Sequence, residues 1–216
     1  MAQFTEQLNM AVTRVPNLPE NARVPTSGSL SFSDFYGGLG VVPMTYEIIG
    51  AGGEGAGGYF GGNGAAGGDS SFSGTNFTTV TVAGGAGGTG TGAFDGRWTP
   101  GEVGEASYYG PGGAGGANSD SFRQTPGYAA PSTSYGAGGG GGGAHPFSAQ
   151  NGGDGGHAGT RATGTINVIP GTTITVNIGA GGNAISGGGN GASGYAAFNV
   201  RGQTFVFISN GSFIVP

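Results

Sequence analysis

Short stretches of alternating or β-branched apolar residues recur along the chain and predict β-strands. The stretches of this kind are Met44–Ile49, Phe77–Ala83, Tyr195–Val200 and Thr204–Ser209. Two more, Thr165–Ile169 and Thr172–Ile178, flank the turn signal Pro170–Gly171. This arrangement predicts a β-hairpin over Thr165–Ile178.

Glycine-dense runs separate the predicted strands, and they lie at 50–68, 84–92, 110–116, 136–143, 152–159 and 179–194. The sequence Ile-Gly-Ala-Gly-Gly occurs twice after a predicted strand, at Ile49–Gly53 and at Ile178–Gly182. Glycine costs about 1 kcal/mol per helical position relative to alanine, so no long helix is expected past residue 43. The remaining connectors read as irregular and rich in aromatic residues: Phe94–Tyr109, Asn118–Tyr135 and Ala144–Asn151.

The composition is unusual for a folded chain, because 55 of 216 residues are glycine and 11 are proline. Such a content is typical of low-complexity or disordered segments. Disordered chains are usually rich in charge and poor in aromatic residues. This chain has only 8% charged residues, with 35% hydrophobic and 10% aromatic residues. We therefore expect an ordered fold that depends on glycine.

Gly50–Gly55 fits the G-x-G-x-x-G pattern of dinucleotide-binding turns. That turn must open a helix, and the following residues AGGYFGGNGAAGG are unsuited to one. Polyglycine II explains the runs better, because its backbone has three residues per turn and no internal hydrogen bonds, which leaves its amides for neighbouring segments. A flexible glycine linker is the alternative, but linkers lack interleaved strands and aromatic residues.

We therefore predict an irregular or all-β fold: a packed polyglycine-II bundle with short strands and hairpins at its ends. Essentially no α-helix is expected beyond the N-terminal arm. Residues 1–42 contain little glycine and form a predicted attachment segment, and residues 43–216 form the glycine-rich domain.

Charge and residue types exclude several functions. The chain has no lysine, its arginines are isolated and its net charge is −5, so nucleic acid is not expected as a partner. Cysteine is absent and no H-E-x-x-H pattern accompanies the two histidines, so we expect no metal, no cofactor and no enzymatic activity. The N-terminus lacks the pattern of a signal peptide, and no apolar run is long enough to span a membrane.

Two stretches carry a resemblance to a known family: YEIIGAGGEGAGG at Tyr46–Gly58 and GTINVIPGTTITVNIGAGG at Gly164–Gly182. They resemble the glycine-rich domain of bacteriophage tail-fibre and tail-tip proteins, over roughly Met44–Val200. The style is similar to that of the tip adhesins of T-even-like long tail fibres. PTSGSLSFSDFYG, from Pro25 to Gly37, resembles a segment frequent near the start of phage structural proteins.

This resemblance implies a virion protein at a tail fibre or tail tip, with other virion proteins and a host surface receptor as partners. A homotrimer and a single copy per trimeric fibre are both compatible with it. The N-terminal segment is either an arm that packs on the body or a segment that orders on a partner protein. The residues expected to attach it to the virion are Leu30, Phe32, Asp34, Phe35 and Tyr36.

Aromatic and arginine side chains framed by Gly, Ser and Asn are typical of recognition loops. The residues predicted to bind host glycan or outer-membrane protein are Phe94, Arg97, Trp98, Tyr108, Tyr109, Phe122, Arg123, Tyr128, Tyr135, His145 and Phe147. The alternative for each ring is a structural role, capping the bundle and burying glycine backbone. The predicted function is receptor-binding adhesion. Alternatives are a non-adhesive virion protein, such as a capsid decoration or tail spacer, and a cellular matrix or adhesive protein.

Overall fold

The computed structural model describes residues 40–58, 62–90, 99–117, 125–143, 152–184 and 187–216. These residues form an all-β structure without a helix. The predicted attachment residues, Leu30, Phe32, Asp34, Phe35 and Tyr36, lie outside this part of the chain.

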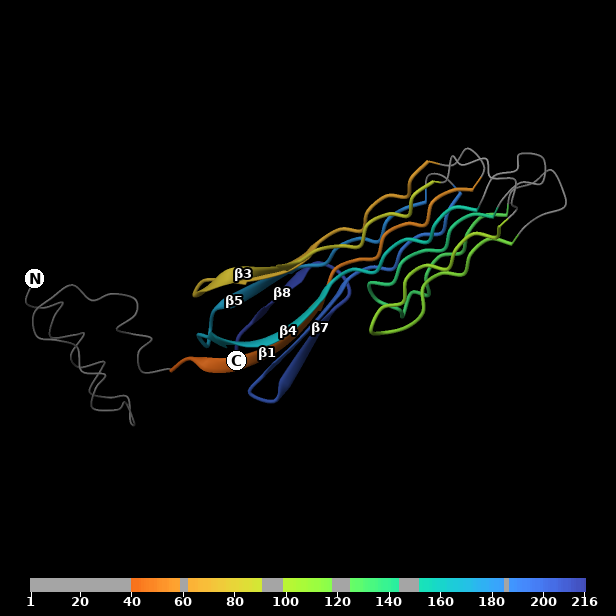
Figure 1. The fold of residues 1–216 in the computed structure, drawn as a ribbon. Helices are drawn as coiled ribbons and strands as arrows, with labels where there is room; N and C mark the ends of the chain where they lie inside the picture. Colours follow the sequence, from red (N-terminus) through yellow and green to blue (C-terminus); the bar gives the residue numbers. More distant parts are fainter. Residues whose placement is uncertain (1–39, 59–61, 91–98, 118–124, 144–151, 185–186) are drawn as a thin grey trace, which may run out of the picture.

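The strands form two four-stranded antiparallel sheets at one end of the molecule (Figure 1). Sheet A has the order β4-β1-β6-β7, and sheet B has the order β3-β2-β5-β8. The strands are β1 (Val42–Ile49), β2 (Ser70–Gly74), β3 (Phe77–Val82), β4 (Arg161–Val168), β5 (Thr173–Asn177), β6 (Tyr195–Val200), β7 (Gln203–Phe207) and β8 (Gly211–Ile214).

The predicted strands are confirmed with small shifts of their ends, except that β4 begins at Arg161 and not at Thr165, but the predicted hairpin is wrong. The chain does turn at Gly171, which has a φ of 81°. However, β4 pairs with β1, whereas β5 pairs with β2 and β8. Val168 and Ile174 bury their side chains in one core from opposite sheets, so the two strands belong to different sheets instead of pairing. The short strands β2 and β8 were not predicted.

The hydrophobic core lies between the two sheets and follows the two-residue period of the strands. In β5 the buried residues Ile174 and Val176 alternate with exposed ones. The rings of Phe72 and Phe198 meet edge to face, 5.0 Å apart, at its centre. Full burial of such a side chain contributes about 1.5–3 kcal/mol to folding.

Beyond the sheets the chain continues as extended segments that run side by side (Figure 1). We call them the glycine array; its segments are 50–58, 62–69, 83–90, 99–106, 110–117, 125–131, 136–143, 152–160, 178–184 and 187–194. Strand pairing carries on into the array. After the ladder partners Ile49 and Arg161, the amide of Gly50 donates to the carbonyl oxygen of Thr160 at 2.9 Å.

Within the array the contacts repeat every three residues instead of every two. The amides of segment 50–58 donate in rotation to three neighbours: Gly50, Gly53 and Ala56 to 152–160, Ala51 and Glu54 to 62–69, and Gly52 and Gly55 to 187–194. Its carbonyl oxygens accept from three other segments, 83–90, 136–143 and 178–184. Segment 50–58 is therefore surrounded by hydrogen-bonded neighbours.

The array is built in layers that extend the sheets. The first layer continues sheet A: it contains segments 152–160, 50–58 and 187–194, in the order of β4, β1 and β6. The second layer continues sheet B: it contains segments 83–90, 62–69 and 178–184, in the order of β3, β2 and β5. A third layer, formed by 99–106, 136–143 and 125–131, packs on the sheet A side, and 110–117 bonds to all three. The third layer continues no strand, so it ends in turns beside the outer face of sheet A.

Within the array, neighbouring backbones approach so closely that many positions accept only glycine. A Cβ added at Gly139 would lie 1.9 Å from the carbonyl oxygen of Gly189, and one at Gly53 would lie 2.0 Å from that of Ala86. Neither residue has a positive φ. Among the described residues, positive φ values occur at Arg201 and at six glycines, and Gly53 and Gly139 are not among them. The interior segments 50–58 and 136–143 are buried throughout their length.

Outer segments expose every third residue, such as Pro111, Ala114 and Ala117. This period explains one difference from the sequence prediction. Residues 101–105 and 125–130, predicted as irregular connectors, belong to the array, since side chains fit at its exposed positions. The runs 50–68 and 179–194 each contain parts of two antiparallel segments. The described strands also lie at one end of the array and not at both.

Candidate functional site

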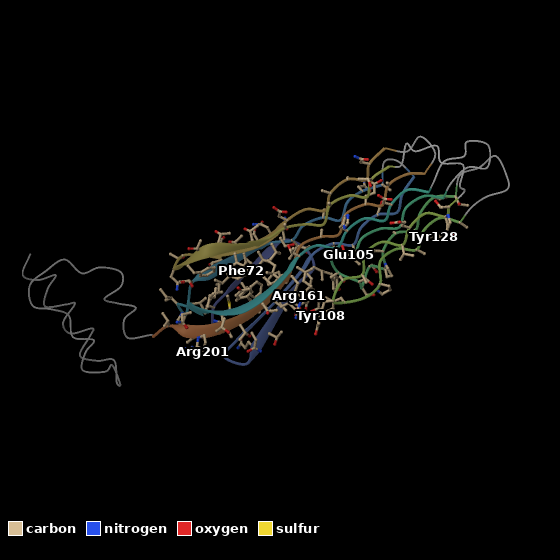
Figure 2. The ribbon with its side chains drawn as sticks, viewed as in Figure 1. Phe72, Glu105, Tyr108, Tyr128, Arg161 and Arg201 are labelled. Carbon is tan, nitrogen blue, oxygen red and sulfur yellow. The ribbon has the colours of Figure 1, made fainter. Side chains whose placement is uncertain are left out.

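The structure places four of the residues predicted to bind a receptor: Tyr108, Tyr109, Tyr128 and Tyr135. The others lie outside the described residues, and they are Phe94, Arg97, Trp98, Phe122, Arg123, His145 and Phe147. The four tyrosines do not form one group, because Tyr128 lies apart from the other three toward the far end of the array (Figure 2).

Three of the predicted residues meet a fourth tyrosine where the array joins sheet A. Tyr109 packs against Tyr108, Tyr135 and Tyr195, with ring centroids 5.4, 5.6 and 4.9 Å apart. Tyr135 stacks on Tyr195 at 5.0 Å. We call Tyr108, Tyr109, Tyr135 and Tyr195 the tyrosine cluster. It holds the turns of the third layer against the start of β6.

An ion pair on sheet A joins the tyrosine cluster to the strands. Arg161 Nε lies 2.6 Å from Glu47 Oε1, and the Tyr109 hydroxyl donates to Glu47 Oε2 at 3.0 Å. The Arg161 guanidinium also stacks over the Tyr108 ring, 4.0 Å from its centroid (Figure 2). Both carboxylate oxygens of Glu47 thus accept a hydrogen bond.

The surroundings shift two pKa values upward. Burial is the main cause that raises the pKa of the Tyr109 hydroxyl, and hydrogen bonds with Tyr195 and Glu47 add to it. The hydrogen bond to Glu47 is the main cause that raises the pKa of Arg161. Tyr109 therefore stays a neutral donor and Arg161 a cation across the physiological range.

Glu47, Arg161 and Tyr195 were not predicted from the sequence. Strand alternation supplies the missing signal: in β1 Met44 and Ile48 face the core, which directs Glu47 to the outer face. Arg161 and Tyr195 are the first residues of β4 and β6, and both pair with Ile49 in the sheet. Polar and aromatic residues at the junction of strands and glycine runs therefore mark this site.

The rest of the outer face of sheet A carries hydroxyl and amide side chains. Its exposed polar members are Thr45, Thr163, Thr165, Asn167, Asn199 and Thr204, and the apolar residues Pro43 and Val206 are also exposed on this face. The Asn199 side-chain amide donates to the Thr204 hydroxyl at 3.1 Å. Among the described residues of the strands on this face, the charged side chains are Glu47 and Arg161, and they are paired with each other.

Tyr128 is 64% exposed on segment 125–131. Its backbone is fixed, because its amide donates to Ala114 and its carbonyl oxygen accepts from Gly140. The ring thus projects from a rigid backbone.

The two ends of the molecule differ. Residues 1–39 join the described chain at Gly40, at the sheet end, where Val215 also bonds to Gly171 and Thr172. At the opposite end the array segments terminate together, at the residues that flank 91–98, 118–124 and 144–151 (Figure 1).

In the part of the chain that the structure describes, no group of three or more His, Asp or Glu residues is placed to hold a metal ion. No described helix has the length and apolar character needed to cross a membrane. Comparisons with protein-family models, with curated proteins and with solved structures found no match.

Proposed function

We propose that this chain is a receptor-binding adhesin of a phage virion, carried at a tail fibre or tail tip. In this proposal, residues 1–42 attach it to other virion proteins. The aromatic residues of the predicted receptor-binding set bind host glycan or outer-membrane protein, without bond cleavage. The resemblance of its glycine-rich sequence to tail-fibre proteins suggests this role.

The observation that carries the proposal is the difference between the two ends of the molecule. The N-terminal segment joins the sheet end, and the array segments that flank Phe94, Trp98, Phe122 and Phe147 terminate at the other end. An adhesin needs this arrangement, because its attachment and its receptor contacts must face opposite directions.

We further propose that the array segments are polyglycine-II helices. The three-residue period of hydrogen bonds and burial supports this, since polyglycine II has three residues per turn, whereas a strand repeats every two residues. Such an array would act as a rigid support that presents its connections to a receptor at little entropic cost on binding.

The test is adsorption of the purified, fluorescently labelled full chain to bacteria of a candidate host panel. We expect saturable adsorption to one host type, and at least a tenfold loss with Trp98→Ala combined with Phe94→Ala. The control is Val103→Ala, since Val103 is 66% exposed on the array and is outside the predicted receptor set.

Immunogold labelling of particles supplies the second arm. Label at the tail tip with adsorption supports the adhesin. Label on the capsid or along the tail, with no adsorption to any host, would favour the alternative of a non-adhesive virion protein.

A further inference from the structure

We propose that the outer face of sheet A, bounded by Tyr108, binds an uncharged polysaccharide. This inference rests on the proposed adhesin function and gives it a ligand class and a second contact surface. It involves only described residues, and it lies at the sheet end of the array, away from the end where the array segments terminate.

The surface has the form of a step. Sheet A provides the floor, and the turns that end the third layer of the array rise beside it at Glu47, Arg161 and Tyr195. Tyr108 stands at this step and is 71% exposed. Its neighbour Tyr109 is anchored in the cluster, so the backbone that carries Tyr108 is held in place. The Arg161 guanidinium covers one face of the Tyr108 ring, so the apolar face of a sugar ring would stack against the other.

The floor offers uncharged hydrogen-bonding groups in a regular arrangement. Thr45, Thr163 and Asn199 are exposed on neighbouring strands. Same-face residues recur about every 6.6 Å along a strand, and strands lie about 4.8 Å apart. Hydroxyl and amide groups both donate and accept hydrogen bonds, which matches a chain of sugar hydroxyls.

Charge selects the ligand class. Arg161 is a cation on the floor, but its Nε is bonded to Glu47, so the pair presents no net charge. A phosphorylated or carboxylated glycan would meet a compensated arginine and a chain with net charge −5. Arg201, in the turn between β6 and β7, is an exposed cation at the opposite edge of the face from Tyr108. The observations therefore favour a neutral polysaccharide.

Sheet B provides an internal comparison. Its outer face also carries exposed threonines, for example Thr173 and Thr175 on β5, but the tyrosine cluster lies on the side of sheet A. Thr45 and Thr175 are exposed threonines on inner strands of the two sheets. Substituting each by lysine makes a matched pair of variants.

The experiment measures binding of the full chain to an immobilised panel of neutral and acidic bacterial O-antigen polysaccharides. We expect binding to at least one neutral polysaccharide, with at least a tenfold loss for both Tyr108→Ala and Thr45→Lys. Thr175→Lys and Val103→Ala are expected to stay within twofold of the unmodified chain. Thermal melting verifies that each variant is folded, and Thr45→Lys stands in for Tyr108→Ala if that variant does not fold.

Three outcomes would overturn the inference: binding to acidic polysaccharides alone, binding to none of the panel, or equal loss with Thr45→Lys and Thr175→Lys. Cell adsorption separates this inference from the proposed function. Adsorption that is lost with Trp98→Ala combined with Phe94→Ala and unchanged by Thr45→Lys would retain the adhesin and reject this surface. Polysaccharide binding by a chain that does not adsorb to cells would reject the adhesin and retain the surface.

Discussion

The amide of Ala51 donates a hydrogen bond to the carbonyl oxygen of Gly68 at 3.0 Å, although the two residues continue strands of different sheets. Ala51 follows β1 in sheet A, and Gly68 precedes β2 in sheet B. In the sandwich, the side chains of the core separate such layers, typically by about 10 Å. In the array glycine predominates and few side chains separate the layers, so the two layers approach to hydrogen-bonding distance.

Interior glycines of the array should not tolerate a methyl group. Gly139→Ala would place its Cβ 1.9 Å from the Gly189 carbonyl oxygen, within backbone that has no room to shift. We expect a loss of roughly 1–3 kcal/mol or more in the free energy of unfolding. Gly62→Ala is the control, because an added Cβ there meets nothing within 4 Å, and its effect should stay within about 0.5 kcal/mol. Chemical denaturation of both variants measures the difference, and equal stability would contradict close packing.

The cost of substitution should repeat every three residues along an outer segment. In segment 110–117, Gly112→Ala and Gly113→Ala would each bring a Cβ to about 2 Å from a carbonyl oxygen, at Gly104 and Tyr128 respectively. Ala114 is exposed, so Ala114→Ser should change stability by less than about 0.5 kcal/mol. Melting temperatures across the segment provide the measurement. A two-residue period of tolerance would indicate an ordinary strand.

Glu54 is the buried acid of the interior segments, and its Oε2 accepts the amide of Ala65 at 2.8 Å. Glu54→Ala removes this acceptor and leaves a void, so we expect a destabilisation of at least about 1–3 kcal/mol. Glu54→Gln keeps an acceptor oxygen and nearly the same volume, so its loss should be smaller. Denaturant unfolding of the two variants provides the test, and a glutamine variant as unstable as the alanine variant would count against this role of the side chain.

Tyr109 should make the protein sensitive to alkaline pH. Its pKa is raised in the folded state, so its contribution to stability is complete below the unfolded value of about 10 and declines as the pH rises above it. The folded state must then keep a proton that the unfolded chain releases. Tyr109→Phe removes this dependence. Melting temperatures of both proteins at pH 7 and pH 11 should converge at the higher pH, and a constant difference would contradict the assignment.

Local patterns in the sequence were sufficient to predict most strands and a glycine-dependent packed structure. They did not reveal that β4 and β5 enter different sheets, because Pro170–Gly171 turns the chain equally well within a sheet or between two. Segments 99–106 and 125–131 were also missed, since an outer segment needs glycine only where its neighbours approach. Triplets such as Gly84-Gly85-Ala86 already display this rule.

The site was predicted only in part, for a similar reason. Tyr108, Tyr109 and Tyr135 could be selected as loop aromatic residues, but their position beside Glu47 follows from the layer order of the array. That order depends on hydrogen bonds between residues far apart in sequence, such as Gly139 to Gly53. No local pattern encodes it.

Hydrogen exchange of the glycine amides tests the central claim most directly. In segment 136–143, six consecutive amides, Gly138 to Gly143, donate in rotation to segments 99–106, 50–58 and 125–131. We predict that all six amides exchange as slowly as the amides of β1, because exchange in either place would require the whole fold to open. Exchange at the rate of a free peptide, or protection of alternate amides only, would contradict the array.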